Sequence, residues 1–305
     1  NVIDPLDLMK ENGADTLRVT LNALCVQGRD LKLSADRVEG YRNFMNKVWN
    51  ASRFVLEFST DKNPRWRQKP NRSDELVNRW ILTRLDATAR EVNKAWSEFR
   101  MAEAAELIYH FIWNDVCDWY LESIKLKRDK SEDILHYVWA ESLKLLHPIC
   151  PHLTEEIYHQ FPGVTVEESL MVEAYPEGMD FPDSEALAQF EFLKNTITAL
   201  RTLRAESKVP PGKKIRATIV VGEQGRSHDV LESQSNFIAN LCKVEGWKLV
   251  KKLDSEENQK WSRTSVTSLE AGAAIEICVP LEDLVDLEEE KKRLQKEYTD
   301  LERLI

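Results

Sequence analysis

The run from Asp36 to Val55 has the clearest alternation of apolar and polar positions in the chain. At about 100° per residue, a helix over this run places its large apolar side chains on one side. That side holds Val38, Tyr41, Phe44, Met45, Val48, Trp49, Ser52 and Val55. The opposite side carries Asn43, Lys47, Asn50 and Phe54, with Arg42, Asn46 and Arg53 beside it. The pattern predicts an amphipathic helix with an exposed polar side.

The residue types on this polar side are those that bind unpaired nucleotides. Asparagine is a weak helix former, so Asn43, Asn46 and Asn50 on one exposed helix need an explanation other than helix propensity. Amides read base edges, Lys and Arg bind phosphates, and an outward Phe offers a ring on which a base stacks. An ordinary solvated face of an Asn-rich helix explains the pattern equally well. The helix alone leaves both interpretations open.

Helical periodicity continues to about residue 205. We expect helices over 73–96 with Ser73 as N-cap, over 100–127, over 132–147, from about 154 to before Pro162, and over 184–207. The last of these turns inward Phe190, Leu193, Ile197 and Leu200. Its other side carries a basic stripe of Lys194, Arg201, Arg204 and Lys208. A solvated helix face is the simpler explanation of that stripe, and contact with an RNA backbone is the other.

The period changes after VPPGKK. Alternation over 215–221 predicts a strand, followed by a helical stretch over 230–242 and strands over 246–252, 264–269 and 273–279. From Leu284 the apolar positions follow a heptad, which predicts the first helix of a coiled coil. The seam consists of Leu284, Leu287, Lys291, Leu294, Tyr298, Leu301 and Ile305. The pattern therefore predicts a mainly α chain with a small α+β domain and the start of a coiled coil.

Composition places the chain among globular proteins with room for two domains. It has 305 residues, of which 42% are hydrophobic and 31% charged, and a net charge of −10. The sequence has no apolar run near the roughly 18 residues needed to cross a bilayer, so we expect a cytoplasmic protein without a membrane partner. The acidic total argues against a surface coated with nucleic acid, although local basic patches remain compatible with it.

Candidate catalytic and metal-binding patterns are missing from the sequence. We find no GxGxxG, GxxxxGK[ST], HExxH or GxSxG motif, and no cluster of ionisable residues with ligand spacing. The five cysteines are far apart, and we expect all of them to be buried thiols. His147 and His152 lie in a proline-rich turn, where a structural role is expected. The aromatic residues of FIWNDVCDWYLESIK are expected in the core, with its acids pairing to nearby Lys or Arg.

Six segments in one order give the chain a resemblance that covers its whole length. They are NVIDPLDLMKENGADTLR, QGRDLKLSADRVEGYRNFMNKVWNASRF, FIWNDVCDWYLESIK, LLHPICPHLTEEIY, LRAESKVPPGKK and VPLEDLVDLEEEKKRLQKE. The chain resembles the C-terminal half of bacterial-type valyl-tRNA synthetases. GAD.LR and HP..PHLTEEI are shared among the class I synthetases for isoleucine, leucine, methionine and valine. QGRD, CDWYLE and VPPGKK are closer to the valine enzymes.

The resemblance implies an order of domains. Residues 1–35 resemble a linker that contacts the tRNA stem, and 36–190 resemble the anticodon-binding helical bundle. Residues 191–280 resemble the small α+β C-terminal domain, and 281–305 the first helix of a truncated coiled coil. In this family NVIDP follows the KMSKS loop that acts on ATP. The HIGH motif, the KMSKS lysines and the editing domain would therefore precede Asn1.

The resemblance also assigns site residues by position. Lys47 and Phe54 are the first candidates for anticodon contact, Phe54 as a stacking face and Lys47 as a hydrogen-bond donor or phosphate anchor. Further anticodon candidates are Asn43, Asn50, Arg53, Arg42 and Asn46, with Leu121 in a facing wall beside Trp119 and Tyr120. The candidates for contact with the tRNA backbone are Lys32, Arg37, Arg201, Arg204 and Lys208.

The partners implied are tRNA-Val and the catalytic half of the same polypeptide, in a monomer. We expect no catalytic residue, cofactor or metal in this chain and no aminoacylation by it alone, because ATP and Mg would bind the catalytic half. The alternative is a free-standing, non-catalytic tRNA-binding or scaffold protein that dimerises through the coiled coil. A purely structural helical protein is a third possibility, and the outward Lys47, Asn50 and Phe54 count against it. The sequence of the residues that precede Asn1 would distinguish between these three hypotheses.

Overall fold

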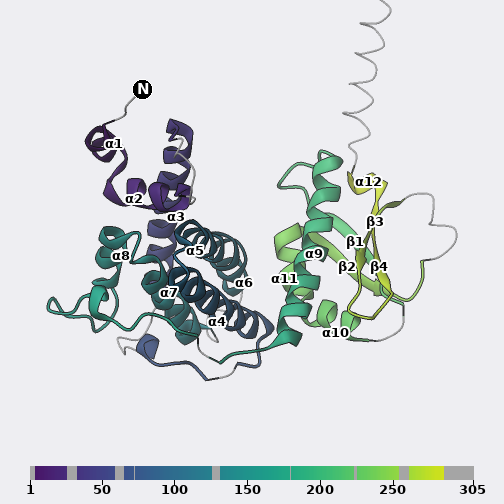
Figure 1. Ribbon diagram of the computed structural model, residues 1–305. Helices are drawn as coiled ribbons and strands as arrows, with labels where there is room; N and C mark the ends of the chain where they lie inside the picture. Colours follow the sequence, from purple (N-terminus) through teal and green to yellow (C-terminus); the bar gives the residue numbers. More distant parts are fainter. Residues whose placement is uncertain are drawn as a thin grey trace, which may run out of the picture. The chain divides into compact units, whose positions relative to one another are not determined.

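The computed structural model describes residues 4–25, 33–58, 65–71, 73–125, 131–178, 180–222, 225–253 and 261–284 (Figure 1). The chain divides into two compact units, Asn1–Ala186 and Leu187–Ile305. We call them the helical unit and the sheet unit. Each has its own buried core and is described by itself.

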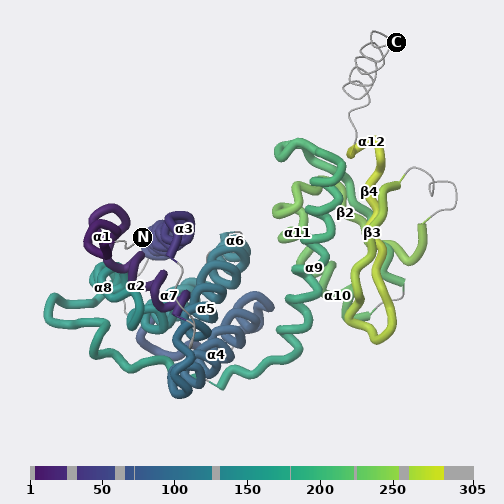
Figure 2. The backbone as a smooth tube through the Cα atoms, turned by 45° about the horizontal axis from the view of Figure 1, so that its top comes forward, coloured from purple at the N-terminus to yellow at the C-terminus, as the bar shows by residue number. Residues whose placement is uncertain are grey.

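The helical unit is built from helices joined by loops. In chain order these are α1 (Pro5–Asn12), α2 (Ala14–Leu24), α3 (Ala35–Glu57), a 3-10 turn (Arg65–Arg67), α4 (Leu76–Ser97), α5 (Met101–His110), a π-helical segment (Phe111–Tyr120), α6 (Leu121–Ile124), α7 (Glu132–Leu146), α8 (Pro151–Tyr158) and a second 3-10 turn (Leu170–Val172). The helices α4, α5 and α7 contact one another, and α3 packs on α7 (Figure 2). The core contains the fully buried side chains of Trp139, Tyr120, Phe44 and Phe111.

Helix α3 confirms the amphipathic helix predicted over 36–55. Its buried side chains include Val38, Phe44, Met45, Val48, Ser52 and Val55. Trp49 is 36% exposed, so its predicted inward position is wrong. On the helical wheel Trp49 lies at one edge of the apolar arc, next to the exposed Arg42.

Three of the predicted helices differ in detail from those in the structure. Helix α4 begins at Leu76, because Ser73 accepts hydrogen bonds from the Glu75 N–H and the Asn78 amide instead of capping the first turn. The helix predicted over 100–127 contains the π-helical segment, whose wider turns sequence periodicity does not reveal. Helix α8 begins at Pro151, since proline suits the first helical position.

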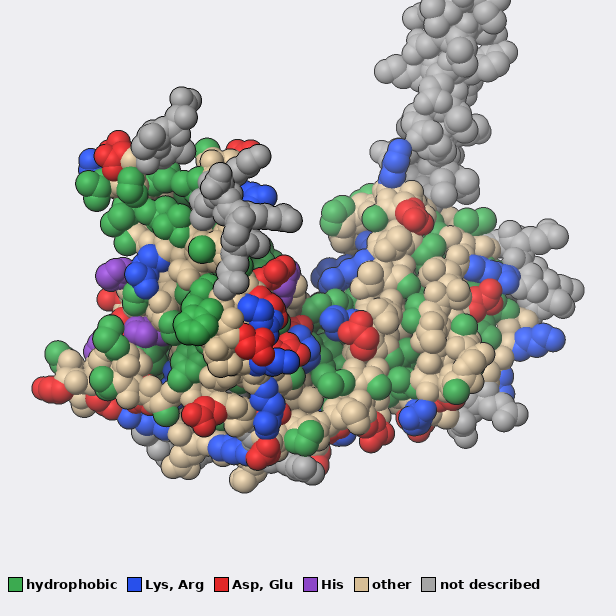
Figure 3. Space-filling view, viewed as in Figure 1, with side chains coloured by type: hydrophobic (Ala, Val, Ile, Leu, Met, Phe, Trp, Pro, Cys, Tyr) green, Lys and Arg blue, Asp and Glu red, His purple; other side chains and the backbone are tan. Residues whose placement is uncertain are grey.

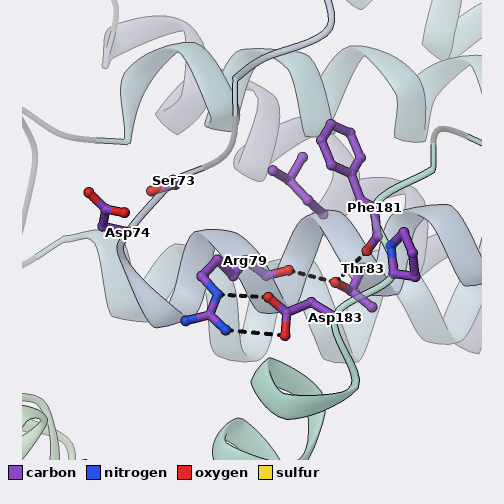
Figure 4. Close-up of a pocket in the computed structure, with 8 residues that line it drawn as sticks. Ser73, Asp74, Arg79, Thr83, Phe181 and Asp183 are labelled. Carbon is purple, nitrogen blue, oxygen red and sulfur yellow. Dashed lines mark hydrogen bonds and ion pairs between the residues drawn. The ribbon is translucent and has the colours of Figure 1, made fainter.

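The segment before α9 is tied back to α4. Arg79 donates two hydrogen bonds to the Asp183 carboxylate, at 2.7 and 3.1 Å (Figure 4). The Thr83 hydroxyl donates to the Phe181 carbonyl oxygen at 2.8 Å. These groups line the pocket of Figure 4 and satisfy one another. These hydrogen bonds therefore fix the end of the helical unit on α4.

The sheet unit combines α9 (Ser184–Glu206) from Leu187 onward, α10 (Arg226–Ser233), α11 (Ser235–Cys242) and α12 (Leu281–Leu284) with the four described strands. The strands β1 (Ile215–Val220), β2 (Val244–Val250), β3 (Trp261–Thr267) and β4 (Ala274–Pro280) form a mixed sheet in the order β2-β1-β4-β3. Among the described strands, β1 and β2 pair in parallel, and the pairs β1–β4 and β3–β4 are antiparallel. The predicted fold class, mainly α with a small α+β domain, is confirmed.

Both the inward face of α9 and the predicted strands are found close to their expected positions. Phe190, Leu193, Ile197 and Leu200 are buried, as predicted. The coiled-coil prediction beyond Leu284 lies outside the described residues. Leu284 itself is buried at the end of α12, which contacts β1 and β4, so this first seam residue belongs to the core of the sheet unit.

Four of the five cysteines are buried: Cys117, Cys150, Cys242 and Cys278. Cys25 is exposed, so the expectation of a buried thiol is wrong there, because this residue follows the last turn of α2. Within the described parts of the chain, no group of His, Cys, Asp and Glu side chains could hold a metal ion. None of the described helices has the length and apolar character to cross a membrane.

Glu270 fixes the N-terminus of α10 in the sheet unit. Its carboxylate accepts from the Ser227 N–H at 3.1 Å and from the Ser227 and Ser268 hydroxyls at 2.5 Å each. A Cβ at Gly225 would come within 2.8 Å of this carboxylate, so glycine permits the close approach. Desolvation opposes ionisation of Glu270, but these hydrogen bonds outweigh it and lower its pKa to about 2.

We expect acid to weaken the sheet unit through Glu270. Because its folded-state pKa is depressed, the stabilisation is present above the unfolded-state pKa of about 4.3. It is lost as the pH falls from there towards 2. Unfolding of wild type and Glu270→Gln, followed at pH 7 and pH 3, tests this. Wild type should lose more stability between the two values than the variant, and equal losses would contradict the assignment.

Candidate nucleic-acid interface

The predicted polar side of α3 is open to solvent over most of its length. Its exposed members are Arg42, Asn43, Asn46, Asn50 and Arg53. Arg37, a candidate for contact with the tRNA backbone, is also exposed but lies near the start of the helix and away from this side. Lys32 lies outside the described residues. The exposed side therefore presents three amides and two guanidinium groups on one helix.

Lys47 lies at the edge of this face, where α3 meets the π-helical segment. Its ammonium donates to the Asp118 carboxylate at 2.5 Å and lies 3.9 Å from the centre of the Trp113 ring. The side chain is 27% exposed. The structure thus holds Lys47 in place between an acid and an aromatic face, an arrangement that helix periodicity does not reveal.

Phe54 lies two turns further along the same edge and is half-buried. Its ring centre is 5.6 Å from that of the buried Phe58, and the Lys125 ammonium lies 5.6 Å from the Phe54 ring. One part of the ring packs on the bundle while the remainder is accessible. Phe54 is therefore neither fully outward nor a core residue.

Helix α7 packs against the buried side of α3 and holds it in place. The Trp139 indole N–H donates to the Ser52 hydroxyl at 3.1 Å, and the His136 Nε2 lies 3.0 Å from the Val55 carbonyl oxygen. Both contacts lie on the turns next to Phe54. Helix α3 is therefore a rigid support for the residues at its C-terminal half.

The π-helical segment is anchored from α4 on two sides. Arg84 donates to Asp115 at 2.9 Å, and the Tyr120 hydroxyl donates to the Asn78 side-chain oxygen at 2.9 Å. Complete burial raises the pKa of Tyr120 well above its ordinary value. The predicted pairing of the acids in this segment is confirmed for Asp115 and Asp118.

For two residues predicted to contact the tRNA, burial in the structure contradicts the prediction. Leu121 is 6% exposed and packs in the bundle core, so it offers no wall to a base. Arg204 is 8% exposed, and its guanidinium donates to the carbonyl oxygens of Pro210 and Lys213. It holds the PPGKK loop and is not part of an exposed stripe. Arg201 and Lys208 are exposed.

The structure shows an aromatic cluster next to Lys47 that the sequence pattern does not predict as a group. The rings of Tyr109 and Trp113 are stacked, with centres 5.6 Å apart and planes 20° from parallel. Tyr41 and Phe44 of α3 contact Tyr109. The i, i+4 spacing of Tyr109 and Trp113 is the signal that could have revealed the stack.

Comparison with known proteins shows which proteins this chain is similar to. Residues 78–219 match the family model described as the anticodon-binding domain of tRNA ligase. The valine–tRNA ligase of Syntrophotalea carbinolica is 37% identical over 99% of this chain, which covers 34% of that protein. The valine–tRNA ligase of Mesorhizobium japonicum is 40% identical over 97% of this chain, which covers 32% of that protein. The chain matches the C-terminal region of valine–tRNA ligases.

The chain spans about a third of the length of these valine–tRNA ligases. A solved complex of an Agrobacterium radiobacter K84 LeuRS with tRNA and LeuAMS aligns over 61% of this chain and 22% of that chain. Its TM-score is 0.47 at 18% identity, below the level that establishes a shared fold.

Two segments that carry the resemblance to valine–tRNA ligases meet in the helical unit. Asp15 of GADTLR accepts from the backbone N–H groups of Leu153 and His152 in HPICPHLTEE, at 2.6 and 3.3 Å. Arg18 donates to the Pro148 carbonyl oxygen at 2.9 Å. Buried His147 lies 2.7 Å from the Thr154 hydroxyl, and desolvation lowers its pKa. These contacts join α2 to α8, and His147 has the expected structural role.

Hydrophobic side chains also gather at the surface of α1 and α2 (Figure 3). Leu6 is 61% exposed, and Met9 and Leu21 are partly exposed. Exposed apolar side chains that lie close together favour contact with another protein surface.

Proposed function

We propose that the chain recognises the anticodon loop of a valine tRNA for a valine–tRNA ligase. The observation that carries the proposal is the exposed face of α3. It presents Asn43, Asn50 and Arg53 beside the partly accessible Lys47 and Phe54 on a helix fixed by α7. Unpaired bases need edge-reading amides, cations and a stacking ring close together, and this face offers all of them. The match to valine–tRNA ligases supports valine tRNA as the RNA.

Other exposed residues contact the RNA backbone and the catalytic half of the polypeptide. Arg37, Arg201 and Lys208 are exposed and provide backbone contacts that add affinity without base specificity. The apolar side chains on α1 and α2 contact the catalytic half of the polypeptide. ATP, Mg and the joining of valine to tRNA belong to that half, and the ligase works as a monomer in the cytoplasm.

Replacing Phe54 with alanine tests the stacking role. A base stacked on this ring contributes about 1–3 kcal/mol, so binding of a valine tRNA anticodon stem-loop should weaken by that amount. Fluorescence anisotropy with a labelled stem-loop measures the affinity, and thermal unfolding reports the stability of the same protein. Phe54→Tyr keeps an aromatic ring and should retain most of the affinity.

A purely structural role of Phe54 predicts a different result. If Phe54 served only the bundle, Phe54→Ala would lower the unfolding temperature and leave the affinity of the folded protein unchanged. That outcome would remove Phe54 from the interface.

A further inference from the structure

Asp118 lies within hydrogen-bonding distance of the Lys47 ammonium and is itself accessible. The two side chains form an ion pair at 2.5 Å, and Asp118 is 47% exposed. A phosphate that approached the Lys47 ammonium would therefore meet a carboxylate beside it. Like charges at such a distance repel, and a lysine that is already paired gains little from a second anion. Lys47 is poorly suited to binding a phosphate.

The same arrangement suits a neutral hydrogen-bond acceptor. A lysine ammonium has three N–H donors. Asp118 takes one, and the Trp113 ring covers another side of the nitrogen at 3.9 Å. No other hydrogen bond of Lys47 is found among the described residues. A remaining donor can therefore be given to a ring nitrogen or carbonyl oxygen on the edge of a base.

The element that carries Asp118 is itself fixed. Asp118 lies in the π-helical segment between Asp115, which accepts from Arg84, and Tyr120, which donates to Asn78. These bonds lie three residues before and two residues after it. The position of the carboxylate is therefore set by α4, independently of the Lys47 side chain that it holds.

We propose that Asp118, together with Trp113, is a positioning residue that masks the charge of Lys47 and aims this lysine at a base edge. The inference rests on the proposed function and deepens it, because it assigns Lys47 to the choice between bases and not to the general affinity for RNA. Lys47 then discriminates between bases and contributes little to the attraction of the RNA backbone. Asp118 keeps it from acting as a general phosphate anchor.

The test is Asp118→Asn in the full 305-residue chain, which removes the charge at nearly constant size. Binding is measured over a range of salt concentrations, with a valine tRNA anticodon stem-loop and with stem-loops in which each anticodon base is changed in turn. We expect tighter binding of all these RNAs and a salt dependence steeper by about one ion, because the Lys47 charge is released. Discrimination at one base should fall by about tenfold, the worth of one charge-assisted hydrogen bond.

Two further variants separate this effect from a general one. Asp118→Glu keeps the carboxylate and should keep the wild-type discrimination. Glu91→Gln removes one charge from an exposed position of α4 and should leave discrimination unchanged. If Asp118→Asn retains the wild-type discrimination at every base, whatever its salt dependence, the inference is overturned while the proposed function stands. If wild type itself shows no preference among the stem-loops, the proposed function fails and the inference fails with it.

Discussion

Trp139→Ala should lower the free energy of unfolding of the helical unit by about 3–5 kcal/mol. Trp139 is completely buried, so its removal leaves a large cavity behind α3. Its indole N–H also binds the Ser52 hydroxyl, which would lose that partner. Chemical denaturation followed by circular dichroism measures the loss.

Trp139→Phe is the matched control. It removes the N–H and part of the volume but keeps an aromatic ring in the core, so about 1–2 kcal/mol should be lost. A loss below 1 kcal/mol for Trp139→Ala would show that α7 does not support α3 as the structure indicates. The Phe54 edge of α3 should then bind RNA equally well with or without the tryptophan.

Asp15→Asn should cost about 2–3 kcal/mol, although the substitution barely changes the size of the side chain. Asp15 is buried, and its two carboxylate oxygens accept from the first backbone N–H groups of α8. An asparagine has one acceptor oxygen, so its amide group would face an N–H donor and leave it without a partner. The helix would also lose a negative charge at its N-terminus.

Asp7→Asn is the control for Asp15→Asn. Asp7 is exposed and forms an ion pair with Lys10 on the surface of α1, at 3.2 Å. Its replacement should change the stability by less than about 0.5 kcal/mol. Thermal melts of the two variants, recorded side by side, check the difference. Equal and small effects would contradict the role assigned to Asp15 in joining α2 and α8.

Most helices and strands could be predicted from the sequence because their apolar spacing is regular. The periodicity of α3 and α9 placed their buried sides correctly, with Trp49 as the exception at an arc edge. Periodicity does not report changes in helical pitch, so the π-helical segment was missed. The start of α4 was misplaced because the Ser73 hydroxyl accepts a hydrogen bond from the Asn78 amide instead of capping the helix.

The candidate site was only partly accessible to sequence reasoning. The polar side of α3 could be predicted because every residue on it belongs to one helix. The pairing of Lys47 with Asp118 joins residues 71 positions apart, and no local pattern encodes such a contact. Arg204 shows the opposite case, because a basic residue in a stripe turned out to bind carbonyl oxygens of the next loop. A basic residue therefore predicts a solvated or RNA-facing side chain only where tertiary hydrogen bonds do not hold that side chain inside the fold.

The most direct test of anticodon recognition is the affinity of the wild-type chain for anticodon stem-loops. The valine tRNA stem-loop is compared, at one salt concentration, with stem-loops in which each anticodon base is changed in turn. Recognition through α3 predicts that at least one change weakens binding by about 1–3 kcal/mol, as the loss of one specific base contact does. Equal affinity for every stem-loop would contradict it.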